Sequence, residues 1–537
     1  MLGTVLIVGA GPTGMTAALE LSRFGVPVRL IDKLPTPSPA DAEQSRAVAV
    51  QARTLELLEM RGLSQELAEI GHPTVGASFY GDARRFLHLD LSQVGSRYNY
   101  ILLVSQKVTE RVLHEAIEKK GVVVEHGVEF AGFAPGAPAA EAKPLKVLLR
   151  HSDGHLEETE ATWLIDAEGA HSLVRKTLNL PFEGRTFDTQ YVLGDLFVDG
   201  DLSESEYHVF TSEHGNMGLF PMGHARFRLI AANPIATPSE EAAPTIDELQ
   251  AIYDQRSHIP ARFRDMIWAS WFRVNSRIAS RLRIGRVLLG GDAAHIHSPA
   301  AGQGMNTGIQ DMINLAWKLA MVIHGRAPED LLDTYEQERL PVMRNVLRKT
   351  EKLAALMGSR NPIVRRLIDN LGPWIGNIPQ VQDLLSSRLS QLAIGYRGSP
   401  LSELCGRAAR LQPGDRLPDL PVRSRIADGD WEDRRLFSVL DPSRFTLLYV
   451  HPEADDARGL YWSEAARPWE SFIDVVEILP SLNKPAQLRF QAVFGRQMNG
   501  ILLIRPDGYV GFAGNKDTSA SDLTAYCRRW LTAARAA

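Results

Sequence analysis

The chain is poor in cysteine and has no long apolar run. Its 537 residues include only Cys405 and Cys527, which lie far apart and outside any Cys-x-x-Cys pair. This usage argues against a disulfide framework, a zinc ribbon and a dithiol redox centre. No window approaches the roughly 18 uninterrupted apolar residues of a membrane span, and the N-terminus lacks the basic segment and cleavage site of a signal peptide. We therefore expect a soluble, cytoplasmic protein.

The chain also lacks a strong excess of charge of either sign. There are 59 basic and 64 acidic residues, which give a net charge of −5. A nucleic-acid-binding or anionic-membrane surface usually shows as a basic excess or cluster, so we expect neither partner. The apolar fraction of 44% is that of a globular protein, and the length predicts two or three domains.

The N-terminus carries a nucleotide-binding pattern. Residues 4–33 read as a strand, a glycine turn, an amphipathic helix and a second strand. In Gly9-x-Gly11-x-x-Gly14, the first glycine permits the tight turn, the second admits a pyrophosphate, and the third lets helix and strand pack closely. Asp32 ends the second strand, where a carboxylate can accept hydrogen bonds from a ribose. The spacing predicts a bound dinucleotide and leaves open whether it is NAD or FAD.

A second glycine-rich stretch, GDAAHIHSPAAGQGMNTGIQD, covers residues 291–311. Asp292, His295 and His297 could converge on a metal, but no further Cys, His, Asp or Glu cluster supplies the missing ligand, and we predict no metal. The run from Pro299 to Asn306 instead opens a helix, whose free N–H groups suit the electron-rich edge of a flavin. Asp292 would then bind the ribityl hydroxyls, and the histidines would pack or hydrogen-bond beside the cofactor.

The section from about 183 to 280 alternates like an antiparallel sheet and is expected to roof a substrate pocket. No arginine stands out for holding a substrate carboxylate, which favours a neutral phenolic or polycyclic substrate. His208, His214 and Tyr207 could help to deprotonate a phenol, or could simply lie on surface loops. The strand residues that could line the pocket, each of which could equally be a core residue, are Phe210, Met217, Phe220 and Pro221.

Several segments resemble the FAD-dependent aromatic hydroxylases, the single-component phenol and para-hydroxybenzoate hydroxylase group. GAGPTG and GDAAHIHSPAAGQGMNTGIQDMINLAWKLA are similar to its two flavin motifs, and SRAVAVQARTLELLEMRGL, SQKVTERVL and LLDTYEQERLPV to further family segments. The resemblance implies an α/β fold with a Rossmann-type FAD-binding domain over residues 1–182 and 281–400. It also implies an inserted mixed or antiparallel β-sheet substrate domain over 183–280, and a C-terminal thioredoxin-like α/β domain over 410–537 that is redox-silent without Cys-x-x-Cys.

The resemblance also assigns residue roles. It implies catalytic roles for Arg46 beside flavin and pyridine nucleotide, for Glu168, and for Pro299 beside the flavin ring. Two positions depart from the family pattern, Glu168 where aspartate is usual and Ala301 where glycine is usual. Because the acid is kept at position 168, we expect tuning there and not loss. The implied cofactor contacts are Gly9, Gly11, Pro12, Thr13, Gly14, Asp32, Lys33, Arg46, Gln106, Asp292, Pro299, Gly302, Gln303, Gly304, Met305 and Asn306.

The implied reaction is hydroxylation of a small aromatic molecule. NADPH or NADH would reduce FAD and leave, and O2 would form a flavin C4a-hydroperoxide that transfers OH to the ring, so that the cofactor carries the chemistry. Alternatives are epoxidation or a Baeyer–Villiger reaction on the same fold, or a binding protein that keeps the fold without catalysis. A flavin halogenase is disfavoured because WASW at 268–271 does not match Trp-x-Trp-x-Ile-Pro. A homodimer is compatible with the sequence.

Overall fold

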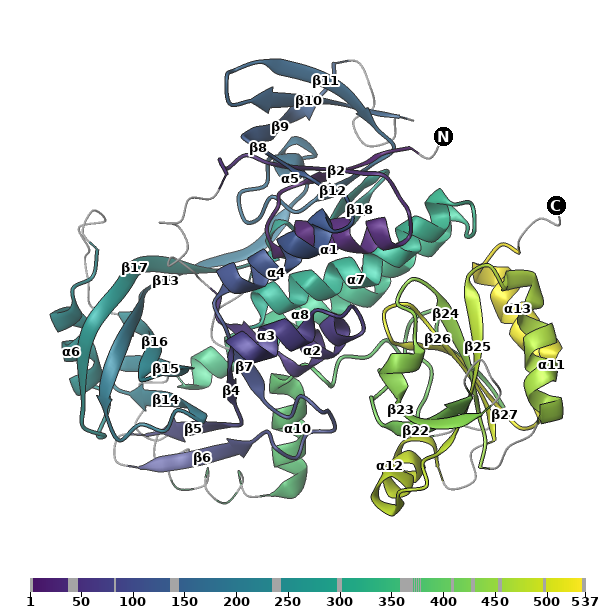
Figure 1. Cartoon of the computed structure of the whole chain (residues 1–537). Coiled ribbons are helices and arrows are strands. Elements are labelled where there is room, and N and C mark those ends of the chain that lie inside the picture. Colours follow the sequence, from purple (N-terminus) through teal and green to yellow (C-terminus); the bar gives the residue numbers. More distant parts are fainter. Residues whose placement is uncertain are drawn as a thin grey trace.

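The computed structural model consists of a flavin-type domain, a large β-sheet beside it and a C-terminal α/β module (Figure 1). It describes residues 3–36, 47–81, 84–135, 144–233, 243–296, 302–357, 370, 372, 374, 376, 378–406, 410–425, 430–452, 456–495 and 499–533. Four positions singled out in the sequence lie outside these ranges, namely Arg46, His297, Pro299 and Ala301.

A six-stranded sheet in the order β18-β19-β12-β1-β2-β8 forms the centre of the flavin-type domain. All neighbouring pairs are parallel except β18 with β19. β1 is wholly apolar and buried, as expected for a parallel strand that is covered on both faces. The strands are β1 (Val5–Val8), β2 (Val28–Asp32), β8 (Val124–His126), β12 (Trp163–Asp166), β18 (Arg283–Ile284) and β19 (Val287–Leu289).

Helices cover one face of this sheet and a small antiparallel sheet covers the other (Figure 1). Apolar residues of both layers belong to the same buried core. The helices are α1 (Pro12–Arg23), α4 (Gln106–Glu118) and α7 (Gly304–Ile323), and the small sheet consists of β9 (Val128–Phe133), β10 (Leu145–His151) and β11 (Leu156–Ala161).

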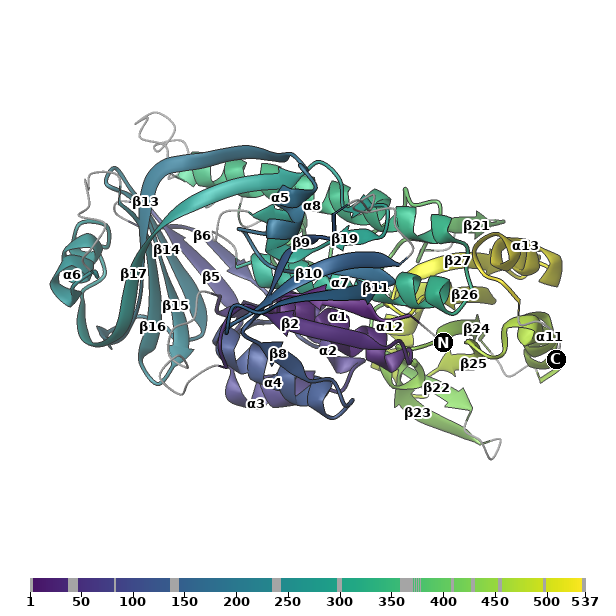
Figure 2. The ribbon, with the colours of Figure 1, turned by 90° about the horizontal axis from the view of Figure 1, so that it is seen from above.

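The second large sheet has eight strands in the order β20-β17-β13-β16-β15-β14-β5-β6, with one parallel pair, β14 with β5. Its strands β13 and β17 are long and arch from the flavin-type domain to the far side of the molecule (Figure 2). Besides strands from 183–280, it recruits β5 and β6 from earlier in the chain and β20 from later. Its strands are β5 (Gly76–Tyr80), β6 (Arg85–Asp90), β13 (Phe182–Gly200), β14 (Glu206–Ser212), β15 (Gly215–Gly223), β16 (Arg226–Asn233), β17 (Ala261–Ala279) and β20 (His295–Ile296).

The C-terminal module is a seven-stranded sheet with helices on both faces. Side chains of β24 alternate between two cores, one shared with α11 and α13 and the other with α12. The elements are β21 (Glu403–Cys405), β22 (Pro421–Arg425), β23 (Trp431–Arg435), β24 (Phe445–Val450), α11 (Asp456–Ala466), β25 (Ile473–Pro480), α12 (Lys484–Phe494), β26 (Gly500–Ile504), β27 (Val510–Asn515) and α13 (Ala520–Trp530).

Further helices, 3-10 turns and short strands make up the rest of the described elements. The remaining helices are α2 (Ala52–Glu59), α3 (Ser64–Ile70), α5 (Leu173–Thr177), α6 (Ile246–Asp254), α8 (Asp333–Met357) and α10 (Pro379–Leu389), with 3-10 turns at Gly291–Ala293, Glu329–Leu332, Leu436–Val439 and Arg467–Trp469; the remaining strands are β3 (Ala49–Val50), β4 (His72–Thr74) and β7 (Ile101–Leu103).

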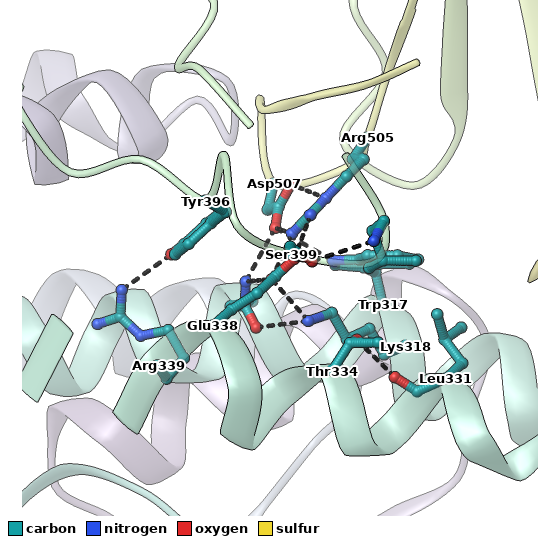
Figure 3. A network of polar contacts seen from close by, with 12 residues as sticks. Trp317, Lys318, Leu331, Thr334, Glu338, Arg339, Tyr396, Ser399, Arg505 and Asp507 are labelled. Carbon is teal, nitrogen blue, oxygen red and sulfur yellow. Dashed lines mark hydrogen bonds and ion pairs between the residues drawn. The ribbon is translucent and has the colours of Figure 1, made fainter. Parts of the chain in front are cut away.

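A buried ionic cluster, formed by Lys318, Glu338, Arg505 and Asp507, joins the C-terminal module to α7 and α8 (Figure 3). Arg505 donates from both terminal nitrogens to the Glu338 carboxylate, at 2.6 and 2.8 Å. Lys318 Nζ donates to Glu338 Oε2 at 2.8 Å. The paired charges hold the pKa of Glu338 below its ordinary range although burial alone would raise it. The module is therefore joined to the flavin-type domain by fully paired buried charges.

Candidate functional site

A cavity of about 700 Å³ lies between the six-stranded and the eight-stranded sheets. Its volume is typical of a site for a small molecule or cofactor. Both sequence motifs converge on it, together with α4 and the segment from Ala47 to Ala49. The predicted cofactor and catalytic residues that line it are Gly9, Gly11, Pro12, Thr13, Asp32, Lys33, Gln106, Glu168, Asp292, Gly302, Gln303, Gly304 and Met305.

The glycine turn after β1 leaves room for a ligand at one position only. A Cβ on Gly9, where φ is +102°, would lie 2.3 Å from the Ala167 carbonyl oxygen. A Cβ on Gly14 would lie 1.8 Å from the Gly9 oxygen, so Gly14 serves the packing of α1 and lies behind the cavity wall. A Cβ on Gly11 would meet nothing within 4 Å. This open cradle fits a pyrophosphate at the start of α1.

Asp32 closes the glycine turn from the end of β2. Its Oδ2 accepts a hydrogen bond from Ala10 N at 2.7 Å, and its Oδ1 accepts one from Leu34 N at 2.8 Å. Each carboxylate oxygen can accept a second bond. Asp32 therefore orders the turn and retains acceptor capacity for ribose hydroxyls at the cavity wall.

The turn Gly291–Ala293 packs against α1. We call it the flavin-facing turn, after the role that the sequence resemblance implies for Asp292. Gly291 has φ of +58°, and a Cβ there would lie 2.4 Å from Thr13 Oγ1. The same hydroxyl lies 2.4 Å from the position of a Cβ on Gly308 of α7. Thr13 thus fits between two glycines, and this close approach brings Asp292 to the cavity beside the start of α7.

Asn306 supports the cavity wall from behind. It is fully buried and is absent from the lining. Its Oδ1 accepts from Gln51 N at 2.8 Å, and its Nδ2 donates to Ala49 O at 2.8 Å and Gly302 O at 2.9 Å. Asn306 thereby ties the lining residues 47–49 to the N-terminus of α7, instead of contacting the cavity as the resemblance implied.

The motif from Asp166 to Arg175 forms the floor beside the glycine turn. Glu168 Oε2 accepts from Leu173 N and Val174 N, both at 2.9 Å, which caps the short helix α5. Burial, together with the neighbouring carboxylate of Glu168, raises the pKa of Asp166 to about 7. Arg175 donates to Ala293 O at 2.7 Å and so holds the flavin-facing turn.

His295 is buried behind the cavity wall and does not line it. Its Nε2 lies 2.8 Å from Asp311 Oδ2. Of the two sequence alternatives, packing or hydrogen bonding, His295 forms a hydrogen bond, which it makes to α7 behind the cavity wall. Within the described ranges, no group of three or more His, Cys, Asp or Glu side chains could hold a metal ion.

Of the four predicted substrate-pocket residues, Phe220 alone is placed on the cavity. Strand side chains alternate between faces, so Met217 and Pro221 point to the face opposite Phe220. Phe210 and Met217 belong to a buried core on that opposite face, where Phe210 stacks on Tyr80 with ring centroids 4.8 Å apart. The sequence pattern predicted the strands, but it did not predict which of their two faces borders the cavity.

The three candidates for deprotonating a phenol do not offer a base to the cavity. His208 and His214 are absent from the lining. His208 is buried, which lowers its pKa, and its Nε2 lies 2.8 Å from Ser203 O. Tyr207 does line the cavity, but burial raises its pKa well above the usual value for a phenol. It is therefore neutral near pH 7.

The substrate side of the cavity is rich in aromatic and aliphatic side chains. Tyr207 Oη and Trp268 Nε1 are buried polar atoms that have no hydrogen-bond partner within the described part of the chain. No arginine stood out in the sequence for holding a substrate carboxylate, yet Arg273 of β17 lines the cavity. Besides Phe220, the wall is lined by Leu193, Tyr207, Ile230, Trp268, Trp271 and Phe272.

Two family models match this chain. Residues 3–350 match the model described as FAD binding domain, and residues 411–534 match the model described as Aromatic-ring hydroxylase, C-terminal. None of the helices in the described part of the chain combines the length and apolarity that crossing a bilayer requires. The matched ranges cover both the cavity motifs and the C-terminal module.

Similar proteins act as monooxygenases. The chain is 33% identical over 532 residues to 6-methylpretetramide 4-monooxygenase of Streptomyces rimosus, covering 97% of this chain and 92% of that protein. It is 32% identical over 524 residues to pentachlorophenol 4-monooxygenase of Sphingobium chlorophenolicum, covering 94% and 93%. A solved structure of an anhydrotetracycline hydroxylase from Streptomyces rimosus superposes with a TM-score of 0.78 at 29% identity, covering 99% of this chain and 100% of that one. The chain belongs to the FAD-dependent aromatic-ring hydroxylases and is a flavoprotein monooxygenase.

Proposed function

We propose that this enzyme hydroxylates a phenolic or polycyclic aromatic molecule in the cytoplasm, with FAD, O2 and NADPH or NADH. The observation that carries the proposal is one cavity whose two sides differ in chemistry. One side is built from the glycine turn, Asp32 and the flavin-facing turn, and the other from aromatic side chains. Nucleic acid, a membrane and a metal have no part in the proposal, and a homodimer is the assembly we propose to test for.

We assign the holding of the cofactor to residues of this chain as follows. The open approach at Gly11 admits the pyrophosphate, and Asp32 accepts from the ribose. Asp292 and Gln106, which both line the cavity, would hold the ribityl and ring portions, and the first N–H groups of α7 would suit the electron-rich edge of the ring. When bound, FAD supplies hydride acceptance and O2 activation.

Three further roles are proposed with it. Arg46 and Pro299, which lie outside the described residues, keep the positions beside flavin and substrate that the family resemblance implies. Glu168, whose Oε2 caps α5, is proposed to set the geometry of the nucleotide-facing floor.

Tyr207 and Trp268 are proposed to bind oxygen atoms of the substrate. A buried donor without a partner destabilises a protein by about 1–3 kcal/mol, so a pair of them on a cavity wall suits a ligand that supplies the partners. The indole N–H of Trp268 can only donate, and the Tyr207 hydroxyl can donate or accept. A hydroxylated or carbonyl-bearing aromatic would satisfy both, while Leu193, Phe220 and Ile230 exclude water around it.

The test is a screen of hydroxylated aromatics, from single-ring phenols to four-ring compounds, for stimulation of NADPH oxidation by the FAD-loaded enzyme. We expect a stimulating compound to gain one oxygen atom in a ring-hydroxylated product. A lactone or an epoxide would instead indicate the Baeyer–Villiger or epoxidising alternative. A protein that takes up FAD but oxidises no NADPH with any compound would indicate the binding-protein alternative.

The variant Trp268→Phe sharpens this screen. The variant keeps an aromatic ring and removes the donor. The wild-type enzyme should prefer the stimulating compound to an analogue that lacks the acceptor oxygen, and the variant should lower this preference by about tenfold or more. Trp469→Phe is the matched control, because Trp469 Nε1 is also buried without a partner but lies in the C-terminal module. Equal selectivity in both variants would remove Trp268 from substrate recognition.

A further inference from the structure

Asp311 lies fully buried on α7, directly behind the flavin-facing turn. Its Oδ2 accepts a hydrogen bond from Gly291 N at 3.2 Å and lies 2.8 Å from His295 Nε2. A single carboxylate oxygen therefore binds the residue before Asp292 and the residue three positions after it. Gly291 contributes its backbone N–H and His295 its imidazole, so Asp311 contacts the chain on both sides of Asp292.

The second oxygen of Asp311 is held by α8. Arg339 Nε donates to Asp311 Oδ1 at 2.7 Å, and Arg339 also donates to Thr307 O at 3.2 Å. Burial alone would raise the pKa of Asp311, but Arg339 and His295 outweigh it and hold the pKa below its ordinary value. Asp311 is therefore ionised, and as an acceptor it can bind all three donors at once.

The C-terminal module fixes the far side of Arg339. Arg339 donates to Tyr396 Oη at 2.9 Å (Figure 3). Tyr396 N in turn donates to Gly414 O at 2.7 Å, and its ring lies 4.3 Å from the ring of Tyr509, centroid to centroid. A chain of direct contacts thus runs from the module through Tyr396, Arg339 and Asp311 to the flavin-facing turn.

We propose that Asp311 is a positioning residue that sets the flavin-facing turn so that Asp292 meets the flavin, and that the module acts on the site by fixing Arg339 through Tyr396. This inference rests on the proposed role of Asp292 in holding FAD. The turn is held by Arg175 at Ala293 O and by Asp311 at Gly291 N, so loss of either contact frees one side. A binding site loses affinity for its ligand when the residues that contact the ligand move by about 1 Å.

The test separates positioning from stability. In Asp311→Asn, an amide that can donate replaces an acceptor facing three donors, so the turn should move while the volume is kept. We expect the FAD dissociation constant of the apoenzyme, measured by flavin fluorescence, to rise about tenfold, or about 1.4 kcal/mol. The His295 imidazole 15N signals should shift. The control is Glu403→Gln, which alters an exposed ion pair with Arg529 in the C-terminal module. It should change neither the FAD dissociation constant nor the His295 signals.

A second variant decides the case in which Asp311→Asn does not fold. Tyr396→Phe keeps the ring contact with Tyr509 and removes only the hydroxyl that Arg339 binds. We expect about a threefold rise in the FAD dissociation constant and a smaller shift of the same His295 signals. A lower unfolding temperature of the apoenzyme with unchanged FAD affinity, in whichever of these variants fold, would overturn the positioning role. Failure of the wild-type apoenzyme to bind FAD would instead overturn the proposed function.

Discussion

The ionic cluster at the C-terminal junction and the aromatic wall of the cavity bury polar side chains in opposite ways. In the cluster, the Glu338 carboxylate accepts from Arg505, Lys318, Asn314 and Ser399. On the wall, Tyr207 Oη and Trp268 Nε1 have no hydrogen-bond partner among the residues that the structure describes. The polar atoms are buried in both regions, but only those of the cluster are paired with one another.

This difference separates a junction from a binding surface. Buried polar groups in native proteins are almost always hydrogen-bonded, and those that are not require an explanation. Closed networks order the structure around them, and the cluster orders the contact between two domains. The unpaired groups of the wall retain the capacity to bind an incoming molecule. The following variants test that division, from the largest expected effect to the smallest.

Glu338→Ala should have the largest effect on stability. It leaves the Arg505 and Lys318 charges buried without their carboxylate, and breaking such an arrangement destabilises by about 3–5 kcal/mol. Urea unfolding would measure this as a fall of the midpoint. The control is Arg529→Ala, which breaks an exposed pair worth about 0–1 kcal/mol. An effect of Glu338→Ala no larger than that of the control would show that the cluster is not a stabilising junction.

Asp166 is a buried carboxylic acid next to the carboxylate of Glu168, and it should make the free energy of unfolding depend on pH. Its pKa is about 7 in the folded protein and 3.8 ordinarily, so the folded state binds the extra proton between these values. The free energy of unfolding should then fall as pH rises from 4 to 7, by at most about 1.4 kcal/mol per pH unit.

Asp166→Asn tests this origin directly. The apoenzyme variant should lose that part of the pH dependence, because its side chain does not titrate. Denaturant unfolding at several pH values between 4 and 7 measures the slope for both proteins. Parallel slopes for wild type and variant would assign the dependence to other groups.

Tyr207→Phe should have a small effect on the free energy of unfolding, opposite in sign to that of Glu338→Ala. Removing a buried hydroxyl that has no partner should leave the free energy of unfolding unchanged or raise it by up to about 1 kcal/mol. Tyr98→Phe is the matched control, since Tyr98 is equally buried and its hydroxyl donates to Ser64 Oγ at 2.8 Å. It should lose about 1 kcal/mol. A greater loss in Tyr207→Phe than in Tyr98→Phe would contradict the distinction between satisfied and open groups.

The two cysteines should matter least. Burial raises the pKa of Cys527 to about 12, and burial also raises that of Cys405, so neither thiol is activated. Cys405→Ser combined with Cys527→Ala should leave the substrate-stimulated rate of NADPH oxidation unchanged. A several-fold loss of that rate in a folded variant would overturn the redox-silent interpretation of the module.

The parts of this molecule that could be predicted are those with local signals. The buried strand before Gly9 and the acid after the second strand specify β1, α1 and β2 because turn, helix and strand each obey short-range rules. The start of α7 at Gly304 followed from the same logic. Local pattern did not place Phe210 and Met217 on the core face, because alternation marks two faces without saying which one borders a cavity.

Long-range pairings carried no comparable signal. Strand β5, which also pairs with β6, joins β14 across more than a hundred residues, and Arg505 reaches Glu338 across 167. His295 read as a possible metal ligand beside His297, but its partner is Asp311, 16 positions on in a helix. Such contacts depend on how elements pack, which neither composition nor spacing records.

The central claim is that the cavity hosts oxygen transfer to an aromatic ring. The most direct measurement supplies 18O2, NADPH and the compound that most strongly stimulates NADPH oxidation to the FAD-loaded enzyme, and follows the product by mass spectrometry. The account predicts one 18O atom in a ring-hydroxylated product. Recovery of the compound unchanged, with NADPH consumed only to make hydrogen peroxide, would contradict it.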